Sequence, residues 1–138
     1  MSSIPIDRFE EELHILIAER GKAYFDAQQV RNLQETGEGW SAIIEGTEPY
    51  HVRLEGHDVI TQWHCTCPFE HGPVCKHIAA AFYAVQEQIR VNIANAGGQI
   101  DQWIDQAPIE KLRHLLKMAA QQHQDVRSLI YHEMKRII

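Results

Sequence analysis

The sequence lacks any apolar run long enough to cross a membrane. Its longest uninterrupted apolar stretch is residues 78–85, eight residues, whereas a bilayer span needs about 20. The first five residues contain neither the basic cluster nor the apolar core of a secretory signal. We therefore expect a cytoplasmic protein with no membrane partner.

The cysteines are few, and their number is odd. The chain has three cysteines, and all of them lie between residues 65 and 75. An odd, clustered set does not build a disulfide framework. In a reducing compartment, clustered thiols point instead to a metal site or to redox chemistry.

Positive charge is scarce in the first half of the chain. Residues 1–63 carry five Lys/Arg against twelve Asp/Glu, whereas residues 101–138 carry six against five. Because an acidic surface disfavours duplex DNA, any contact with nucleic acid would come from the C-terminal part. The 138 residues contain 44% apolar and 23% charged side chains, which is typical of one globular domain with at most a small appendage.

The hydrophobic periodicity predicts an α+β fold. Apolar residues from Phe9 to Ile17 recur at helical spacing, with Asp7 and Glu10 as a capping box and Gly21 as the stop. Alternation then predicts a small antiparallel β-meander of three or four strands, separated by turn signals. The predicted strands cover residues 30–34, 40–45, 50–55 and 59–63.

A helical part follows the meander. A long helix is predicted from about Lys76 to Ala94, with an apolar stripe from Ile78 to Ile93 and Gly97-Gly98 at its end. The rest is a C-terminal helical tail. It begins with one short turn around Trp103, continues in a helix whose first residue is Pro108, and closes with a last helix whose apolar residues run from Val126 to Ile137.

The three cysteines and one histidine form a metal-binding pattern. Cys65-x-Cys67 is followed, after seven residues, by Cys75-x-His77. On an extended backbone, residues i and i+2 point to the same side about 6.6 Å apart, so two thiolates can bind one ion. Cys75 lies just before the long helix and His77 in its first turn, and the positive end of the helix stabilises thiolate. Three sulfurs and one imidazole complete a closed tetrahedron, which predicts one structural Zn²⁺ ion.

Other assignments of these residues stay open. His64 and His71 are rival ligands, although His64 alternates away from Cys65 and a loop histidine such as His71 is usually solvated. The cysteines could also be unrelated buried residues, or Cys-x-Cys could be a redox pair. The paired spacing just ahead of a helix favours the metal.

Residues 65–80, Cys-x-Cys-Pro … Cys-Lys-His-Ile-x-Ala, resemble the SWIM-type zinc finger, in its small bacterial type. The family occurs in Swi/Snf-type helicases, Mu-type transposases and small bacterial proteins. The resemblance implies a zinc-stabilised ββα-like unit that binds DNA or protein without catalysis. With it we expect a finger domain at residues 1–97, its core at about 50–85, and a helical extension at 98–138.

The same residues are also similar to a CDGSH-type iron–sulfur site, which uses three cysteines and one histidine. The spacing differs, because His77 follows Cys75 by only two residues and no Asp-Gly-Ser lies between them.

The sequence favours an interaction role over an enzyme. A closed zinc set leaves no position for substrate, and no Gly-x-x-x-x-Gly-Lys-Ser/Thr loop is present. We expect an accessory protein-binding subunit of nucleic-acid-processing machinery, without a small-molecule substrate. The resemblance implies a Swi/Snf-type helicase as its protein partner.

Direct binding of DNA or RNA is the alternative. The last predicted helix carries cations and a tyrosine at helical spacing, and one more lysine lies between two metal ligands. Such side chains can meet phosphates, and the tyrosine can stack on a base, although a solvated amphipathic helix has the same pattern. The candidate residues are Lys76, Arg127, Tyr131, Lys135 and Arg136.

Overall fold

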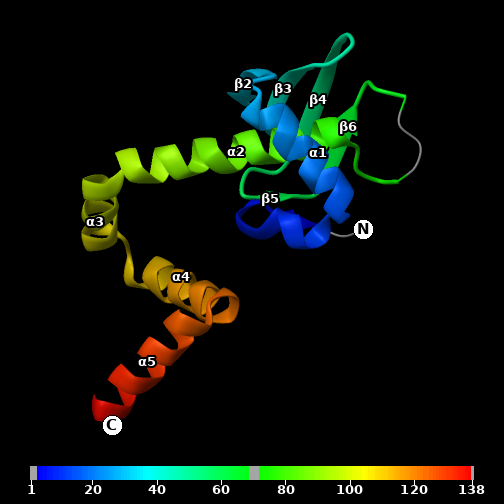
Figure 1. Ribbon diagram of the computed structural model, residues 1–138. Helices are drawn as coiled ribbons and strands as arrows, with labels where there is room; N and C mark the ends of the chain where they lie inside the picture. The colour runs from blue at the N-terminus through cyan, green and yellow to red at the C-terminus, as the bar shows by residue number, and fades with distance from the viewer. Residues whose placement is uncertain (1–2, 69–71, 138) are drawn as a thin grey trace. The chain divides into compact units, whose positions relative to one another are not determined.

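The structure is a computed structural model that describes residues 3–68 and 72–137. The chain divides into two compact units, residues 1–93 and residues 94–138. The fold is α+β, as predicted: short N-terminal helices precede an antiparallel meander, and a long helix follows the cysteine-containing segment (Figure 1).

The N-terminal helical region differs from the prediction. It consists of a 3-10 helix, η1 (Ile6–Glu12), and an α-helix, α1 (Ile15–Asp26). No side chain caps η1, so the predicted capping box is wrong. His14 instead caps α1, since its Nδ1 atom accepts a hydrogen bond from the Leu16 N–H at 3.2 Å. Leu16 itself is 51% exposed rather than buried.

Gly21 does not end the helix. It lies buried inside α1, where that helix meets the long helix α2 (Lys76–Asn95). A Cβ atom at this position would collide with the Cβ atom of Ala79. The glycine therefore permits close helix packing, which local sequence cannot distinguish from a helix stop.

The four-stranded meander is confirmed. Its strands are β2 (Val30–Glu35), β3 (Gly39–Glu45), β4 (Pro49–Glu55) and β6 (Gln62–Cys65), in that order and all antiparallel. Val52 on β4 pairs with Cys65 on β6, so the sheet register sets the position of the first cysteine.

The predicted strand over residues 59–63 is two strands in two sheets. β5 (Val59–Ile60) pairs with β1 (Ile4–Pro5), and only the residues after Thr61 join the meander as β6. The Thr61 N–H donates to the Glu55 carbonyl at 2.9 Å, where the chain changes partner. This switch buries Ile60 completely and leaves Val59 37% exposed.

The core of this unit lies between one face of the meander and the first half of α2. Alternate residues of β3 and β4 supply one side, and Ile78, Phe82 and Val85 supply the other. Phe9 from η1 closes the core against Tyr83, with ring centroids 4.7 Å apart. Burial of each such side chain is worth about 1.5–3 kcal/mol. The predicted stripe of α2 does not stay buried throughout, because Ile93 is 58% exposed.

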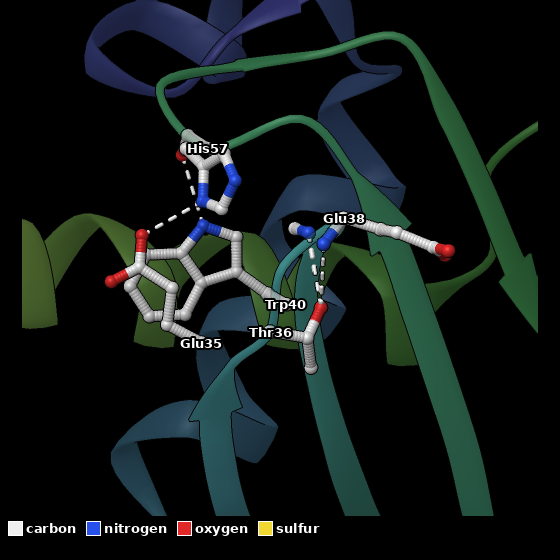
Figure 2. A network of polar contacts seen from close by, with 6 residues as sticks. Glu35, Thr36, Glu38, Trp40 and His57 are labelled. Carbon is white, nitrogen blue, oxygen red and sulfur yellow. Dashed lines mark hydrogen bonds and ion pairs between the residues drawn. The ribbon is translucent and has the colours of Figure 1, made fainter.

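A polar network fastens the β2–β3 turn to the loop after β4 (Figure 2). The Trp40 indole N–H donates to the His57 carbonyl at 2.9 Å, and His57 Nδ1 lies 2.8 Å from the Glu35 carboxylate. The Thr36 hydroxyl accepts from the Gly39 N–H at 3.0 Å. These contacts stabilise the end of the sheet that is distant from the cysteines.

The second unit is helical. It contains α3 (Gly97–Gln106), α4 (Ile109–Gln122) and α5 (Gln124–Ile137). Gly97 is the first residue of α3 rather than the end of the preceding helix, and α3 is longer than the single predicted turn. Pro108 is the N-cap residue of α4 and lies just before its first helical residue. None of the described residues in these three helices is buried. Over the described residues, no helix is both long and apolar enough to span a bilayer.

Candidate metal centre

Four side chains, from the end of β6 and the start of α2 and from the residues next to them, form one cluster. Cys65 ends β6 and Cys67 follows it, whereas Cys75 directly precedes α2 and His77 lies in its first turn. Their potential ligand atoms all lie within 4.8 Å of one another. The structure therefore brings together the complete predicted set.

Backbone pairing positions the first two cysteines. The Thr66 N–H donates to the His51 carbonyl at 3.1 Å, and the His51 N–H donates to the Thr66 hydroxyl at 3.0 Å. These bonds continue the β4–β6 ladder past the end of β6. Because alternate residues of a strand share a face, Cys65 and Cys67 are both half-buried while Thr66 is exposed.

A side chain of β6 positions the second pair. The Trp63 indole N–H donates to the Pro73 carbonyl at 2.7 Å, which fixes the chain as it returns toward α2. Val74 and Cys75 are then buried, and the Cys75 carbonyl accepts the first helical bond from the Ala79 N–H at 3.1 Å. Contacts within the fold therefore position both the Cys65/Cys67 pair and the Cys75/His77 pair.

The geometry fits a tetrahedral ion. His77 Nδ1 lies 3.8 Å from Cys65 Sγ and 3.9 Å from Cys75 Sγ. Zn–S bonds of about 2.3 Å and a Zn–N bond of about 2.0 Å at tetrahedral angles place sulfur and nitrogen about 3.6 Å apart. His77 Nδ1 therefore faces the sulfurs at a distance that one shared ion requires.

Two tyrosines hold the His77 ring. The Tyr50 ring stacks on it with centroids 4.3 Å apart, and the Tyr24 ring meets it edge-on at 5.3 Å. His77 is only 5% exposed, and its Nε2 atom has no hydrogen-bond partner among the described residues. Within the described part of the chain, aromatic packing orients this imidazole.

Sequence reasoning gave these tyrosines no role. For Tyr50 a signal was available in the sequence. It occupies every second position together with Val52 and Leu54, so all three lie on the same, buried side of β4. Tyr24 reaches the site through the close packing of α1 on α2 at Gly21. That tertiary contact has no local sequence signature.

The thiols have unequal acidities. A hydrogen bond from the Cys65 thiol lowers the pKa of Cys75, and contacts with His77 and with the Ile78 N–H, which donates to Cys75 Sγ at 3.5 Å, act in the same direction against burial. The same thiol–thiol bond raises the pKa of Cys65, and burial adds to the effect. The contact with Cys65, helped by His77 and by the Ile78 N–H, therefore favours a thiolate at Cys75, the form that binds metal.

Of the two rival histidines, the structure describes His64, and His64 is not in the cluster. His64 is exposed on the opposite face of β6, where it pairs with Arg53 of β4. His71 lies outside the described residues.

The candidate nucleic-acid contacts fall in two places. Lys76 lies at the metal site, with its Nζ atom 5.5 Å from the centroid of the Tyr24 ring. The other four residues lie on α5, where Lys135 Nζ donates to Tyr131 Oη at 3.1 Å and Arg136 pairs with Glu133 at 3.8 Å. The remaining one, Arg127, is exposed.

Comparison with known proteins agrees with this geometry. Residues 50–86 match the model of the SWIM zinc finger, a segment that contains β4, β6, the four clustered side chains and the first half of α2. No curated protein and no solved structure matches the chain. The match favours zinc over an iron–sulfur cluster. The chain therefore carries a SWIM-type zinc finger at residues 50–86, and its Cys₃His cluster indicates a structural zinc ion.

Proposed function

We propose that Cys65, Cys67, Cys75 and His77 hold one zinc ion in a non-catalytic, cytoplasmic interaction module. The observation that carries this proposal is the convergence of four protein donors within 4.8 Å. Four protein ligands fill a tetrahedral zinc site, so no position is left for a water or a substrate. Zinc would supply a cross-link between the sheet and α2. Tyr24 and Tyr50 would orient the imidazole of His77 toward the ion.

The partner in this proposal is a protein of nucleic-acid-processing machinery, such as a Swi/Snf-type helicase. SWIM fingers mediate contacts with proteins or nucleic acids. Residues 1–93 carry seven Lys/Arg against fourteen Asp/Glu, and this excess of negative charge opposes binding of phosphates. A protein partner is therefore favoured for the unit that contains the finger.

Affinity capture with the zinc-loaded full chain tests this function. We expect a helicase or another nucleic-acid enzyme among the captured proteins, and we expect capture to be lost with Cys75→Ser, which removes one thiolate. The matched control is His64→Ala, since His64 is exposed on β6 and lies outside the four clustered side chains. If the unsubstituted chain captures no more of any nucleic-acid enzyme than the Cys75→Ser variant does, this assignment is wrong.

Direct binding of nucleic acid is the second candidate function. One observation favours it: α4 and α5 together carry six Lys/Arg against three Asp/Glu. Titration of labelled single- and double-stranded DNA over a salt series separates the two candidates. If α5 contacts phosphates, log K falls with log salt by about 0.9 per contact for duplex DNA, and Arg127→Ala or Lys135→Ala lowers that slope by about one.

A further inference from the structure

The helices of the second unit expose apolar side chains that a folded helix normally buries. On α4, Ile109 is 65% exposed and Leu116 is 53% exposed; on α5, Leu129 is 62% exposed and Ile137 is 77% exposed. Isolated helices of 10–14 residues are only marginally stable in water, and most of their stability comes from packing of an apolar face. These helices therefore need an apolar surface against them.

The contact between α4 and α5 covers only part of these faces. The two helices touch, and the half-buried residues Ala119, Ala120, Val126 and Ile130 lie close to their connection at His123. Farther from the connection, the same stripes continue into side chains that stay at least 40% exposed. These are Leu115 and Leu116 on α4 and Met134 and Ile137 on α5.

Positive charge borders the exposed stripes. At 100° per residue, Lys111 lies on one side of the α4 stripe, and Arg113 and Lys117 lie on the other. Arg113 pairs with Glu110 at 3.5 Å. Lys111, Lys117 and Arg127 form no ion pair within the described part of the chain. Three cations thus remain available to a partner's carboxylates.

We propose that α4 and α5 dock an amphipathic helix of a partner protein that carries Asp or Glu on both sides of its apolar stripe. Such a helix would cover the exposed leucine, methionine and isoleucine side chains and would neutralise the bordering cations. The proposal deepens the interaction role proposed above and rests on it. It names the surface and the chemistry of the partner.

Three other occupants match these observations less well. A second copy of the chain that docked through its own α4 and α5 would bring two cationic surfaces together. A nucleic acid would contact the cations but leave Leu116 and Met134 in water. An anionic membrane would attract α4 and α5, but the neighbouring α3 carries Asp101 and Asp105 and no Lys or Arg beside its exposed Trp103.

Two helical peptides test the proposal with the zinc-loaded full chain. The peptides are identical in length and carry leucine at the same apolar heptad positions; one has Glu and the other has Lys at the flanking positions. We expect the Glu peptide to bind at least about tenfold more tightly, since several ion pairs each contribute a small increment. The difference should shrink between about 0.05 and 0.5 M salt.

Charge reversal and stripe disruption identify the surface. The double variant K111E/K117E should reverse the preference toward the Lys peptide, and Leu116→Asp should weaken the binding of both peptides. Arg53→Glu, an exposed change on β4 in the other unit, is the matched control and should change neither affinity. Circular dichroism checks that each variant keeps its helices.

Several results would overturn the proposal: equal affinity for both peptides, no binding of either, or self-association of the chain that Leu116→Asp abolishes. Binding of phosphatidylserine vesicles or of DNA with no binding of the Glu peptide would also overturn it. These readouts do not involve a helicase. Loss of peptide selectivity therefore refutes the docking surface alone, whereas failure to capture a nucleic-acid enzyme refutes the proposed function.

Discussion

The Nδ1 atom of His77 lies 3.8 Å from the Sγ atom of Cys65, although the two residues are twelve positions apart in the chain. Cys65 ends the last strand of the meander, and His77 lies in the first turn of α2. An ion bound between them would join the sheet to the helix that forms the other side of the core. Zinc would therefore stabilise tertiary structure at this junction.

Removal of zinc should unfold the junction and leave the rest of the unit folded. Zinc contributes about 10–16 kcal/mol in isolated finger peptides. Here β3, β4 and α2 also form an apolar core, which should remain folded without the ion. We expect a strong chelator, or Cys75→Ser, to abolish amide-exchange protection at residues 64–68 and 74–80 but not at residues 40–54. Unchanged protection at the junction after verified loss of zinc would contradict this prediction.

Tyr50→Leu should weaken zinc binding by about tenfold, the lower end of what loss of an outer contact to a metal ligand costs. The substitution removes the ring that stacks on His77 at 4.3 Å and leaves only the edge-on Tyr24 ring against the imidazole. A competition titration with a chromophoric zinc chelator measures the change.

Tyr50→Phe is the control for this change. It keeps the ring and loses only the exposed hydrogen bond between the Tyr50 and Thr47 hydroxyls at 2.9 Å. Equal zinc affinities for the Leu and Phe variants would show that ring stacking does not orient His77.

Much of this site could be predicted from the sequence, because its information is local. The i, i+2 spacing of Cys65 and Cys67 places both on one side of an extended chain, and Cys75 and His77 directly precede or begin a helix with a clear apolar stripe. The meander was predictable for the same reason, since alternation of apolar residues marks each strand.

The failures of prediction concern contacts between distant segments. The break at Thr61 arises because β1, a strand near the N-terminus, pairs with β5. Tyr24 approaches His77 only because α1 packs closely on α2. Neither contact leaves a periodic pattern, so sequence periodicity alone could not place these residues.

Tyr83 should titrate at high pH. Burial, together with the hydrogen bond that its hydroxyl donates to the Glu10 carboxylate at 3.0 Å, raises the pKa of Tyr83 to about 12. A group whose pKa is higher in the folded than in the unfolded state stabilises the fold below its unfolded pKa, here near 10, and loses that contribution as the pH rises toward 12. Ultraviolet absorbance of tyrosinate follows the titration.

Glu10→Gln tests the cause of this shift. Without the carboxylate, the pKa of Tyr83 should fall toward its ordinary value, although burial continues to raise it. The stability lost above pH 10 should then be smaller, and its loss should be complete at a lower pH than in the unsubstituted protein. An unchanged titration curve in this variant would show that burial alone sets the pKa of Tyr83.

Gly21→Ala should destabilise the unit that contains the finger by about 1–3 kcal/mol, the usual cost of forcing an extra carbon into a packed contact. The new methyl group would collide with the Ala79 side chain and lie 2.8 Å from the Ala80 backbone nitrogen. Because helix backbone cannot yield as a flexible side chain does, α1 must move away from α2 and carry Tyr24 away from His77. Urea unfolding of the zinc-loaded protein measures the loss. Gly37→Ala provides the matched control, since a Cβ atom there meets nothing within 4 Å; equal stability of the two variants would mean that α1 does not depend on this close approach.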